Sequence, residues 1–233
     1  MMHMDIGIIG AMQPEIDDLL CLLEDPKTDR IGGQIFHTGR LDGKNVAIVR
    51  CGIGKVFAAL TAEAMILRYA PRLLINTGVA GALSPDLFQG DVVVAQDLCQ
   101  HDMDTTVLGD PKGMISGLDR VFLPADEGAR AIVCALPAEG FRIRAGRIAS
   151  GDRFVSTEEE KARIAADFSA VACEMEGGAI AQVAFVNQTP VCVIRAISDG
   201  ADEAARLSFD RFLPLAAGRS AAITRELVRR YEW

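Results

Sequence analysis

Acidic side chains stand at the ends of apolar segments in this 233-residue chain, where they could move protons or bind hydroxyl groups. Glu174 and Glu176 lie two residues apart at the end of one such segment, and Asp199 ends another, four residues after Arg195. Two carboxylates on the same face of a buried strand carry a free-energy cost of burying charge, unless a cation, a helix N-terminus or bound hydroxyl groups compensate for it. One glutamate could therefore accept hydrogen bonds from a sugar diol. Asp199 could donate a proton if its pKa is raised.

Each of these carboxylates also has a structural interpretation that the sequence leaves open. Glu174 and Glu176 could cap the helix that follows them, and Asp199 could be an N-cap or turn residue paired with Arg195. Glu15 lies in the first turn of a predicted helix, where the helix dipole favours acidic residues without any catalytic role. The chemical interpretation requires a fold that brings these side chains together.

Short apolar runs alternate with amphipathic segments along the chain, which is typical of an α/β protein. Helices are predicted over 15–23, 56–69, 125–136, 157–166, 178–186 and 209–230. Strands are predicted over 5–9, 34–41, 45–50, 73–77, 91–96, 143–150, 170–174 and 191–198, with an Asp42-Gly43 hairpin turn after the second. Strands that are apolar throughout favour a mostly parallel, mixed β-sheet flanked by helices. We expect a single domain over residues 1–233, with 101–124 forming a long excursion.

Ligands of such sheets bind at the carboxyl ends of the strands, and this chain gathers glycines and carboxylates there. The segments that follow predicted strands are 10–15, 51–55, 76–81, 150–152, 174–178 and 195–199. Neither the dinucleotide-binding fingerprint nor the phosphate-binding loop is complete in them, so their glycines alone indicate only tight turns. The clustering at one edge of the sheet is more informative than any single motif.

Composition and charge exclude several functional classes. The net charge of −8 argues against binding to nucleic acids or to membrane surfaces. No apolar run approaches the roughly 20 residues of a membrane span, and residues 1–5 are too short and mixed for a signal peptide. Six scattered cysteines and three histidines show no disulfide, zinc or other ligand spacing. We therefore expect no metal and no cofactor, and reduced thiols in the cytoplasm.

The order of the motifs resembles that of the 5′-methylthioadenosine/S-adenosylhomocysteine nucleosidases, within the purine and uridine nucleoside phosphorylase superfamily. The resemblance runs from residue 6 to about residue 215, nearly the whole chain. Its matching segments are IGIIGAM (6–12), CGIGKV (51–56), INTGVAG (75–81), SGD (150–152), EME (174–176), RAISD (195–199) and LSFD (207–210).

The resemblance implies a nucleoside phosphorylase-like fold and hydrolysis of the bond between adenine and a 5′-substituted ribose, a reaction of methionine salvage. By this likeness Asp199 protonates or hydrogen-bonds nitrogen-7 of adenine, and Glu15 takes a proton from the attacking water. Arg195 helps to place that water. Glu176 holds the ribose hydroxyls beside the Met175 main chain, and its charge favours the cationic sugar.

The family's remaining contacts fall on pocket residues and on a partner subunit. The implied substrate-binding residues include Phe154 stacking on adenine, the Val155 main chain at its edge, Met12, Ile53 and Phe209 around the 5′ group, and Val79, Ala80, Gly81, Glu174 and Ser198. Relatives often have serine in place of Val79, and residues 105–115 lack the aromatic side chains often present there. A homodimer is implied, with residues 101–124 near the partner's site.

Two other functions stay open at this point. A purine nucleoside phosphorylase would need a phosphate site, usually with arginines, but the first loop carries Glu15 and the Asn76-Thr77-Gly78 turn has no arginine. A non-enzymatic nucleoside-binding protein would not need both Glu15 and Asp199, a base and an acid. Hydrolysis of 5′-methylthioadenosine, S-adenosylhomocysteine and 5′-deoxyadenosine is the favoured function.

Overall fold

Five apolar strands make up the centre of the fold, because each buries side chains on both of its faces. Successive side chains alternate between two cores: Ile9, Leu74 and Val193 lie in one, and Ile8, Ile75 and Ile194 lie in the other. In the computed structural model, which describes residues 3–233, these strands are β1 (Ile6–Gly10), β4 (Lys44–Arg50), β5 (Leu73–Ala82), β6 (Val92–Gln100) and β10 (Val191–Asp199).

The remaining strands complete a mixed sheet. They are β2 (Glu24–Ile31), β3 (Gln34–Leu41), β7 (Leu123–Pro124), β8 (Ile143–Ser150) and β9 (Ala172–Glu174). The order is β10-β6-β8-β9-β5-β1-β4-β3-β2, and β7 pairs with β6. Because β10 also pairs with β5, the first five strands of this order close on themselves.

The predicted mixed α/β sheet is confirmed, with a larger antiparallel share than the Asp42-Gly43 hairpin alone provides. Among residues 3–233, five strand pairings are parallel and five are antiparallel. The parallel pairings join β1 to β4 and β5, β5 to β10, β6 to β8, and β8 to β9. Parallel pairings therefore join four of the five central strands, β4, β1, β5 and β10, whereas β6 runs antiparallel to β10.

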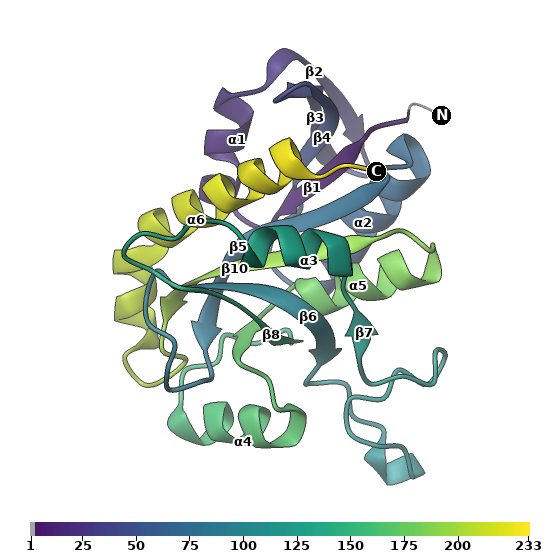
Figure 1. Ribbon diagram of the computed structural model, residues 1–233. Coiled ribbons are helices and arrows are strands. Elements are labelled where there is room, and N and C mark those ends of the chain that lie inside the picture. The colour runs from purple at the N-terminus through teal and green to yellow at the C-terminus, as the bar shows by residue number, and fades with distance from the viewer. Residues whose placement is uncertain (1–2) are drawn as a thin grey trace.

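Helices cover both faces of the sheet (Figure 1). The first core is covered by α2 (Lys55–Tyr69) and α5 (Gly177–Val186). The second is covered by α1 (Asp17–Cys21), α3 (Glu127–Cys134) and the long α6 (Ala205–Arg230). A third, smaller core packs under α4 (Glu158–Phe168), and two 3₁₀ helices, η1 (Gln13–Glu15) and η2 (Thr106–Leu108), lie in connections.

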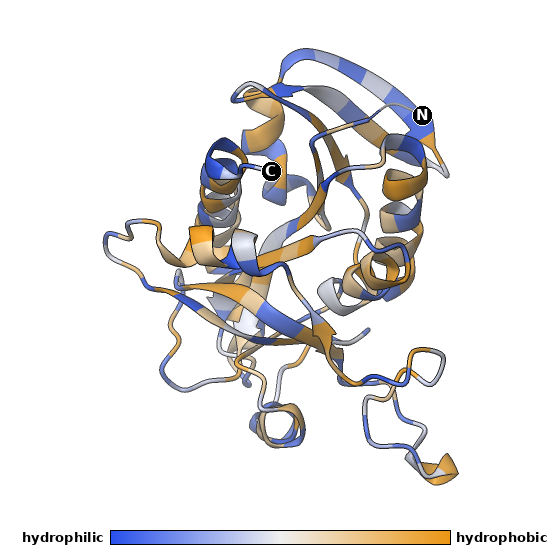
Figure 2. Ribbon diagram, turned by 45° about the vertical axis from the view of Figure 1, so that its right-hand side comes forward, coloured by the Kyte–Doolittle hydropathy of each residue, from blue (hydrophilic) through white to orange (hydrophobic). Residues whose placement is uncertain are grey.

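Several local features differ from the sequence-based prediction: β7 was not predicted, β6 continues to Gln100, α6 begins at Ala205, and three further differences concern β2, β5 and the first helix. β2 was not predicted, because its segment EDPKTDRI has no apolar alternation; it forms by pairing with β3 at the sheet edge, and Figure 2 shows it mainly hydrophilic. β5 extends to Ala82, beyond the predicted end at residue 77. The helix predicted over 15–23 is interrupted at Ile16, so Glu15 ends a 3₁₀ turn and does not begin α1.

Residues 101–124 form the predicted excursion. In Figure 1 it extends away from the sheet, below β6 and β7, with η2 near its tip. The side chains of Val107 and Leu108 are 92% and 79% exposed there, so this tip buries almost nothing within the chain itself. Within residues 3–233, no helix combines the length and the hydrophobicity that crossing a membrane requires.

Candidate active site

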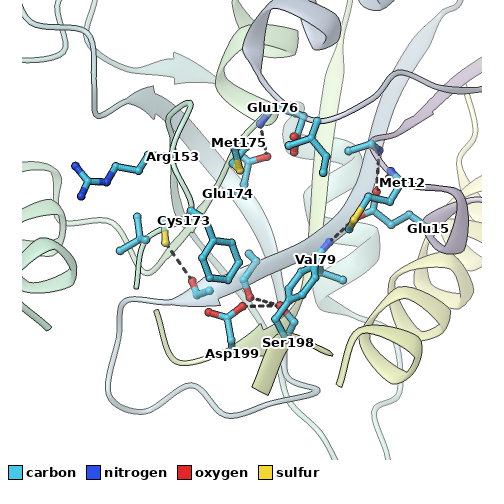
Figure 3. A pocket seen from close by; sticks show the side chains of 17 residues that line it. Met12, Glu15, Val79, Arg153, Cys173, Glu174, Met175, Glu176, Ser198 and Asp199 are labelled. Atoms are coloured by element: carbon cyan, nitrogen blue, oxygen red, sulfur yellow. Dashed lines mark hydrogen bonds between the residues drawn. The ribbon is translucent and has the colours of Figure 1, made fainter. Parts of the chain in front are cut away.

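A pocket opens where the carboxyl ends of β1, β5, β9 and β10 meet (Figure 3). Every residue predicted for the site except Arg195 lines it. Three further lining residues were not predicted: Ala11, Arg153 and Cys173. The full lining is Ala11, Met12, Glu15, Ile53, Val79, Ala80, Gly81, Arg153, Phe154, Val155, Cys173, Glu174, Met175, Glu176, Ser198, Asp199 and Phe209.

Glu15 is a buried carboxylate held by main-chain donors. Its Oε2 accepts hydrogen bonds from the N–H groups of Ala11 and Met12 at 2.7 and 2.8 Å, and its Oε1 accepts one from Val79 at 3.2 Å. Gly78 makes room for this carboxylate, since a Cβ there would lie 2.8 Å from Oε1. Burial raises the pKa of Glu15 despite the charge of Arg195 and these three donors. A raised pKa suits a group that takes up a proton near neutral pH.

Asp199 occupies a β-bulge at the end of β10. The pairing with β5 shifts register between Ile197 and Asp199, which re-aims the last side chains of the strand. Asp199 Oδ2 accepts a hydrogen bond from Ser198 Oγ at 2.7 Å, and Oδ1 accepts one from the Ala201 N–H at 2.9 Å. Burial raises the pKa of Asp199 against these two donors. The suggested pairing of Asp199 with Arg195 is wrong, because Arg195 is bound elsewhere.

Arg195 lies under the pocket, in an ion pair with Glu174. The guanidinium donates to Glu174 and to the side-chain oxygen of Asn76 through Nη2, and to the Asn76 and Ile194 carbonyls through Nη1 at 3.2 and 3.0 Å. Burial pushes the pKa of Glu174 up, but Arg195 and the hydrogen bond from Ser150 outweigh it and lower the pKa. Glu174 is therefore an ionised partner of Arg195.

Glu174 also caps α5, as the structural interpretation of the sequence suggested for this pair. Its Oε2 accepts from the N–H groups of Glu176 and Gly177 at 3.0 and 2.7 Å. The two glutamates do not continue one strand face, because β9 ends at Glu174 and Glu176 enters the helix with φ −134° and ψ −42°. They consequently have different hydrogen-bond partners.

Glu176 is the carboxylate at the top of the pocket in Figure 3. Its Oε1 accepts a hydrogen bond from the Gly54 N–H at 2.9 Å, and its Oε2 is 4.0 Å from Arg195 Nη2. Burial and the neighbouring Glu174 charge raise the pKa of Glu176 to about 8, against the opposing effects of Arg195 and Gly54. A group that donates hydrogen bonds to this carboxylate would lower its pKa and favour the ionised form.

Apolar and aromatic side chains form the rest of the lining. The rings of Phe154 and Phe209 meet edge to face, with centroids 5.6 Å apart. Phe154 is 41% exposed and Ile53 is 55% exposed, so both leave surface free to contact a ligand. Val155 is buried beside Phe154. Across residues 3–233, no group of three or more histidine, cysteine, aspartate or glutamate side chains is arranged to hold a metal ion.

Arg153 is the one basic side chain in the lining of this described pocket. In Figure 3 its guanidinium points away from the space between Glu176 and Asp199. Its Nε lies 3.2 Å from the buried carboxylate of Glu160 on α4. The pocket lining therefore presents carboxylate side chains to a ligand, and its basic side chain, Arg153, is paired with Glu160.

Comparison with known proteins gives consistent matches over nearly the whole chain. The model of the phosphorylase superfamily matches residues 5–229. The 5′-methylthioadenosine/S-adenosylhomocysteine nucleosidase of Glaesserella parasuis is 39% identical over 229 residues, covering 98% of this chain and all of that protein.

Two solved structures from Helicobacter pylori superpose closely. A mutant 5′-methylthioadenosine/S-adenosylhomocysteine nucleosidase with 5′-methylthioadenosine in its active site has a TM-score of 0.94 and 37% identity, covering 99% of this chain and 100% of that one. A futalosine hydrolase has a TM-score of 0.93 and 38% identity, covering 97% of both chains.

Proposed function

The chain belongs to the phosphorylase superfamily and, within it, to the 5′-methylthioadenosine/S-adenosylhomocysteine nucleosidases, and from this membership we propose how its pocket works. The enzyme is an N-glycosyl hydrolase that splits these nucleosides, and by the same chemistry 5′-deoxyadenosine, into adenine and a 5′-substituted ribose. The observation that carries the mechanism is the pair of buried acids with raised pKa, Asp199 and Glu15, which enter one pocket from different sides (Figure 3).

Asp199 is the general acid for the leaving base. In the proposed step the bond between ribose C1′ and adenine N9 breaks, its electron pair goes to adenine, and Asp199 gives a proton to nitrogen-7. Burial raises the pKa of Asp199, which favours the protonated acid, and Ser198 Oγ fixes the carboxyl orientation at 2.7 Å. Such a general acid contributes about 10²- to 10⁴-fold to the rate.

Glu15 is the general base for water. The water oxygen forms the new bond to C1′, and its proton goes to Glu15, so protons and charges balance over the reaction. Three main-chain donors hold the Glu15 carboxylate, which needs no other side chain to orient it. Arg195 lies below the lining, so we assign it an indirect role: it holds the Asn76 and Glu174 side chains beneath the water and sugar sites.

Glu176 binds the ribose 2′ and 3′ hydroxyls, beside the Met175 main chain. Its negative charge favours the oxocarbenium-like sugar of the transition state. Glu174 accepts a hydrogen bond from the Glu176 main-chain N–H, and the charge of Glu174 is balanced by Arg195. A neutral Gln at position 176 would keep the shape of the site and lose this electrostatic contribution.

The apolar lining separates the two ends of the substrate. Phe154 stacks on adenine while the Val155 main chain and Ser198 lie at its edge, and Ala80 and Gly81 complete the base site. Met12, Ile53 and Phe209 contact the 5′ group, and Val79 lies between the sugar and Glu15.

Hydrolysis is favoured over phosphorolysis by the charges of the lining. An incoming phosphate would meet Glu15 and Glu176, while Arg153 points outward to Glu160. Glycoside cleavage by water needs no such anion site. A nucleoside-binding protein without activity would not require Asp199 and Glu15 together.

We propose that the enzyme is a homodimer joined through an apolar patch on α2 and α5. Val56, Leu60 and Leu67 recur at i, i+4 and i+11 along α2, and each is more than half exposed, as are Phe57 beside them and Val186 of α5. Exposed apolar residues concentrated on one surface mark an interaction site. The excursion 101–124, whose tip buries little within its own chain, would then reach the partner's pocket.

The same proposal places the enzyme in the cytoplasm, in methionine salvage. All six cysteines are unpaired, which supports a reducing compartment. The net charge of −8 supports a small-molecule substrate rather than nucleic acid.

The decisive experiment measures adenine release from a panel of 5′-substituted adenosines, with and without phosphate. The expected products are free adenine and free 5′-substituted ribose at rates independent of phosphate. Formation of ribose 1-phosphate would indicate the phosphorylase alternative, and tight binding without turnover would indicate the binding protein. Futalosine belongs in the panel because a futalosine hydrolase is among the matching structures.

A further inference from the structure

Asp152 belongs to a closed ring of contacts beside the pocket. Its Oδ1 accepts a hydrogen bond from the Lys55 main-chain N–H at 2.7 Å. Asp102 completes the ring: its Oδ1 lies 2.6 Å from Lys55 Nζ, and its Oδ2 accepts from the Asp152 N–H at 2.9 Å. Three segments that are distant in sequence are tied together by these three residues.

Helix α2 needs this external acceptor because its own N-cap is Gly54, which has no side chain. Gly54 has φ +100°, a conformation that favours glycine, and a Cβ there would lie 3.0 Å from Asp152 Oδ1. Asp152 therefore supplies from another segment the cap that Ser, Thr, Asp or Asn normally supplies within the helix.

Lys55, whose N–H is capped by Asp152, directly follows Gly54, whose N–H donates a hydrogen bond to Glu176. The Gly54 N–H donates to Glu176 Oε1 at 2.9 Å, and the Lys55 N–H, one residue later, donates to Asp152. If Asp152 is lost, the Lys55 main-chain N–H loses its acceptor, while Lys55 Nζ keeps its contacts with Asp102 and Gln100. The turn at Gly54 is then held less firmly beside Glu176.

We propose that Asp152, with Lys55 and Asp102, is a positioning residue that keeps the Gly54 N–H on the ribose-binding carboxylate of Glu176. This inference rests on the proposed function, since it assigns a supporting group to Glu176 in the cleavage of the nucleoside. It also links the first residues of the excursion, where Asp102 lies, to the sugar-binding end of the pocket.

The consequence is a change in the pH profile and not merely in the rate. Burial, Glu174 and Glu15 raise the pKa of Glu176, whereas Arg195 and the Gly54 N–H lower it. The nearby Cys51 thiol stays neutral because burial raises its own pKa. Losing the Gly54 donor raises the pKa of Glu176 further. The ionised form is then lost at a higher pH as the solution is acidified.

The alkaline side of the profile should not change. The Asp199 carboxyl contacts Ser198 and Ala201 and none of the ring residues, so its titration does not depend on Asp152. A shift of the acid limb alone therefore indicates a specific effect on Glu176, whereas general damage to the site would change both limbs.

The experiment compares kcat/KM for 5′-methylthioadenosine against pH in the full-length wild type, Asp152→Ala and Asp152→Asn. Asparagine keeps an oxygen that can accept from the Lys55 N–H. The matched control is Asp126→Ala, which removes the N-cap of α3, an acceptor for the Ala129 N–H at 2.7 Å far from the pocket. Melting temperature and the dissociation constant of adenine, which has no ribose, are measured for each variant.

For Asp152→Ala we expect kcat/KM on the acid side of the profile to fall about 3-fold, the change that a pKa shift of roughly half a unit produces. Its acid limb should move upward by roughly half a pH unit, with the alkaline limb and adenine binding unchanged. Asp152→Asn should restore most of the wild-type kcat/KM and most of the wild-type position of the acid limb. Asp126→Ala should lower the melting temperature and leave the profile as in the wild type.

The inference is overturned if Asp152→Ala keeps the wild-type acid limb, or if the asparagine variant behaves like the alanine variant. A wild-type protein that releases no adenine would instead overturn the proposed function, and this inference with it. Those two failures are distinguished by the wild-type assay alone.

Discussion

The main-chain nitrogen of Val79 lies 3.2 Å from Oε1 of Glu15, so Val79 supports the proposed catalytic base through its backbone. Relatives often have serine at this position, and the sequence alone suggested that a hydroxyl contact to the water or sugar is missing. The contact to Glu15 does not depend on the side chain. The departure from the family therefore leaves the base in place, and its effect is confined to the adjoining wall of the pocket.

Replacing Glu15 by glutamine should remove the base and keep the fold. We expect kcat to fall by about 10²- to 10⁴-fold, because an amide cannot take the proton from water. The melting temperature should change little, since the neutral side chain avoids burying a charge. Single-turnover adenine release measures the first effect and calorimetry the second. Turnover within threefold of the wild type would contradict the assigned role.

The Asp199→Asn variant should separate binding from turnover. Its amide can still donate a hydrogen bond to nitrogen-7 but cannot transfer a proton, so adenine binding should persist while kcat falls by about 10²-fold or more. Because the active form of Asp199 is protonated and burial raises its pKa, wild-type activity should fall as pH rises through that pKa. The residual activity of the variant should lack this alkaline decline. An unchanged alkaline limb in the variant would assign the decline to another group.

Substrate binding should release protons near neutral pH, because the pKa of Glu176 is raised to about 8 in the free enzyme. Ribose hydroxyls that donate to the carboxylate favour its ionised form, so an uncleavable 5′-methylthioadenosine analogue should expel part of a proton at pH 7. Titration calorimetry in buffers of different ionisation enthalpy measures the number of protons released on binding. The Glu176→Gln variant and the ribose-free ligand adenine are the controls, and both should release fewer protons.

The stability of the free enzyme has a corresponding pH dependence. The pKa of Glu176 is raised on folding, so its protonated form is favoured in the folded state. Its contribution is fully present below the ordinary pKa of a glutamate and is lost as pH rises through about 8. Glu174 has the opposite sign: its pKa is lowered, so its contribution is present above the ordinary value and is lost on acidification.

The Leu60→Asp variant should dissociate the proposed dimer. Leu60 is 63% exposed in the centre of the α2 patch, and a buried carboxylate in an apolar interface is strongly unfavourable. Sedimentation should show a monomer with an intact fold and reduced activity, because the partner's excursion no longer reaches the pocket. Leu215→Asp, at a position 48% exposed on α6 and outside the pocket lining, is the control. A fully active wild-type monomer would refute the shared site.

The sequence predicted the pocket well where its residues follow apolar strands. Apolar runs set the strands, and the carboxyl ends of parallel strands meet at one edge, so Glu15, Glu176 and Asp199 could be placed together. Ala11 was within reach of the same reasoning, because it stands between Gly10 and Met12 in a segment already singled out. Side-chain pairing was not predictable: Arg195 pairs with Glu174 across the sheet, whereas proximity in the chain suggested Asp199.

The parts that were missed depend on contacts between distant segments. The polar strand β2 exists only through its pairing with β3, which no local pattern signals. Cys173 lines the pocket because β9 runs antiparallel to the end of β5, where Cys173 lies opposite Gly81. Arg153 lines it because its loop folds over the strand ends and is tied to α4. Strand pairing and loop packing decide each of these placements.

The buried Glu174–Arg195 pair also constrains how this enzyme can diverge. Both side chains are almost fully buried, and removing one would leave an uncompensated charge at a cost of about 3–5 kcal/mol. That is a large part of the 5–15 kcal/mol that typically stabilises a domain. Single substitutions at either position should therefore be strongly selected against, whereas we expect the exposed rim around Ile53 and Arg153 to tolerate change. Lineages of this enzyme should differ in the substrates they prefer long before they differ in this pair.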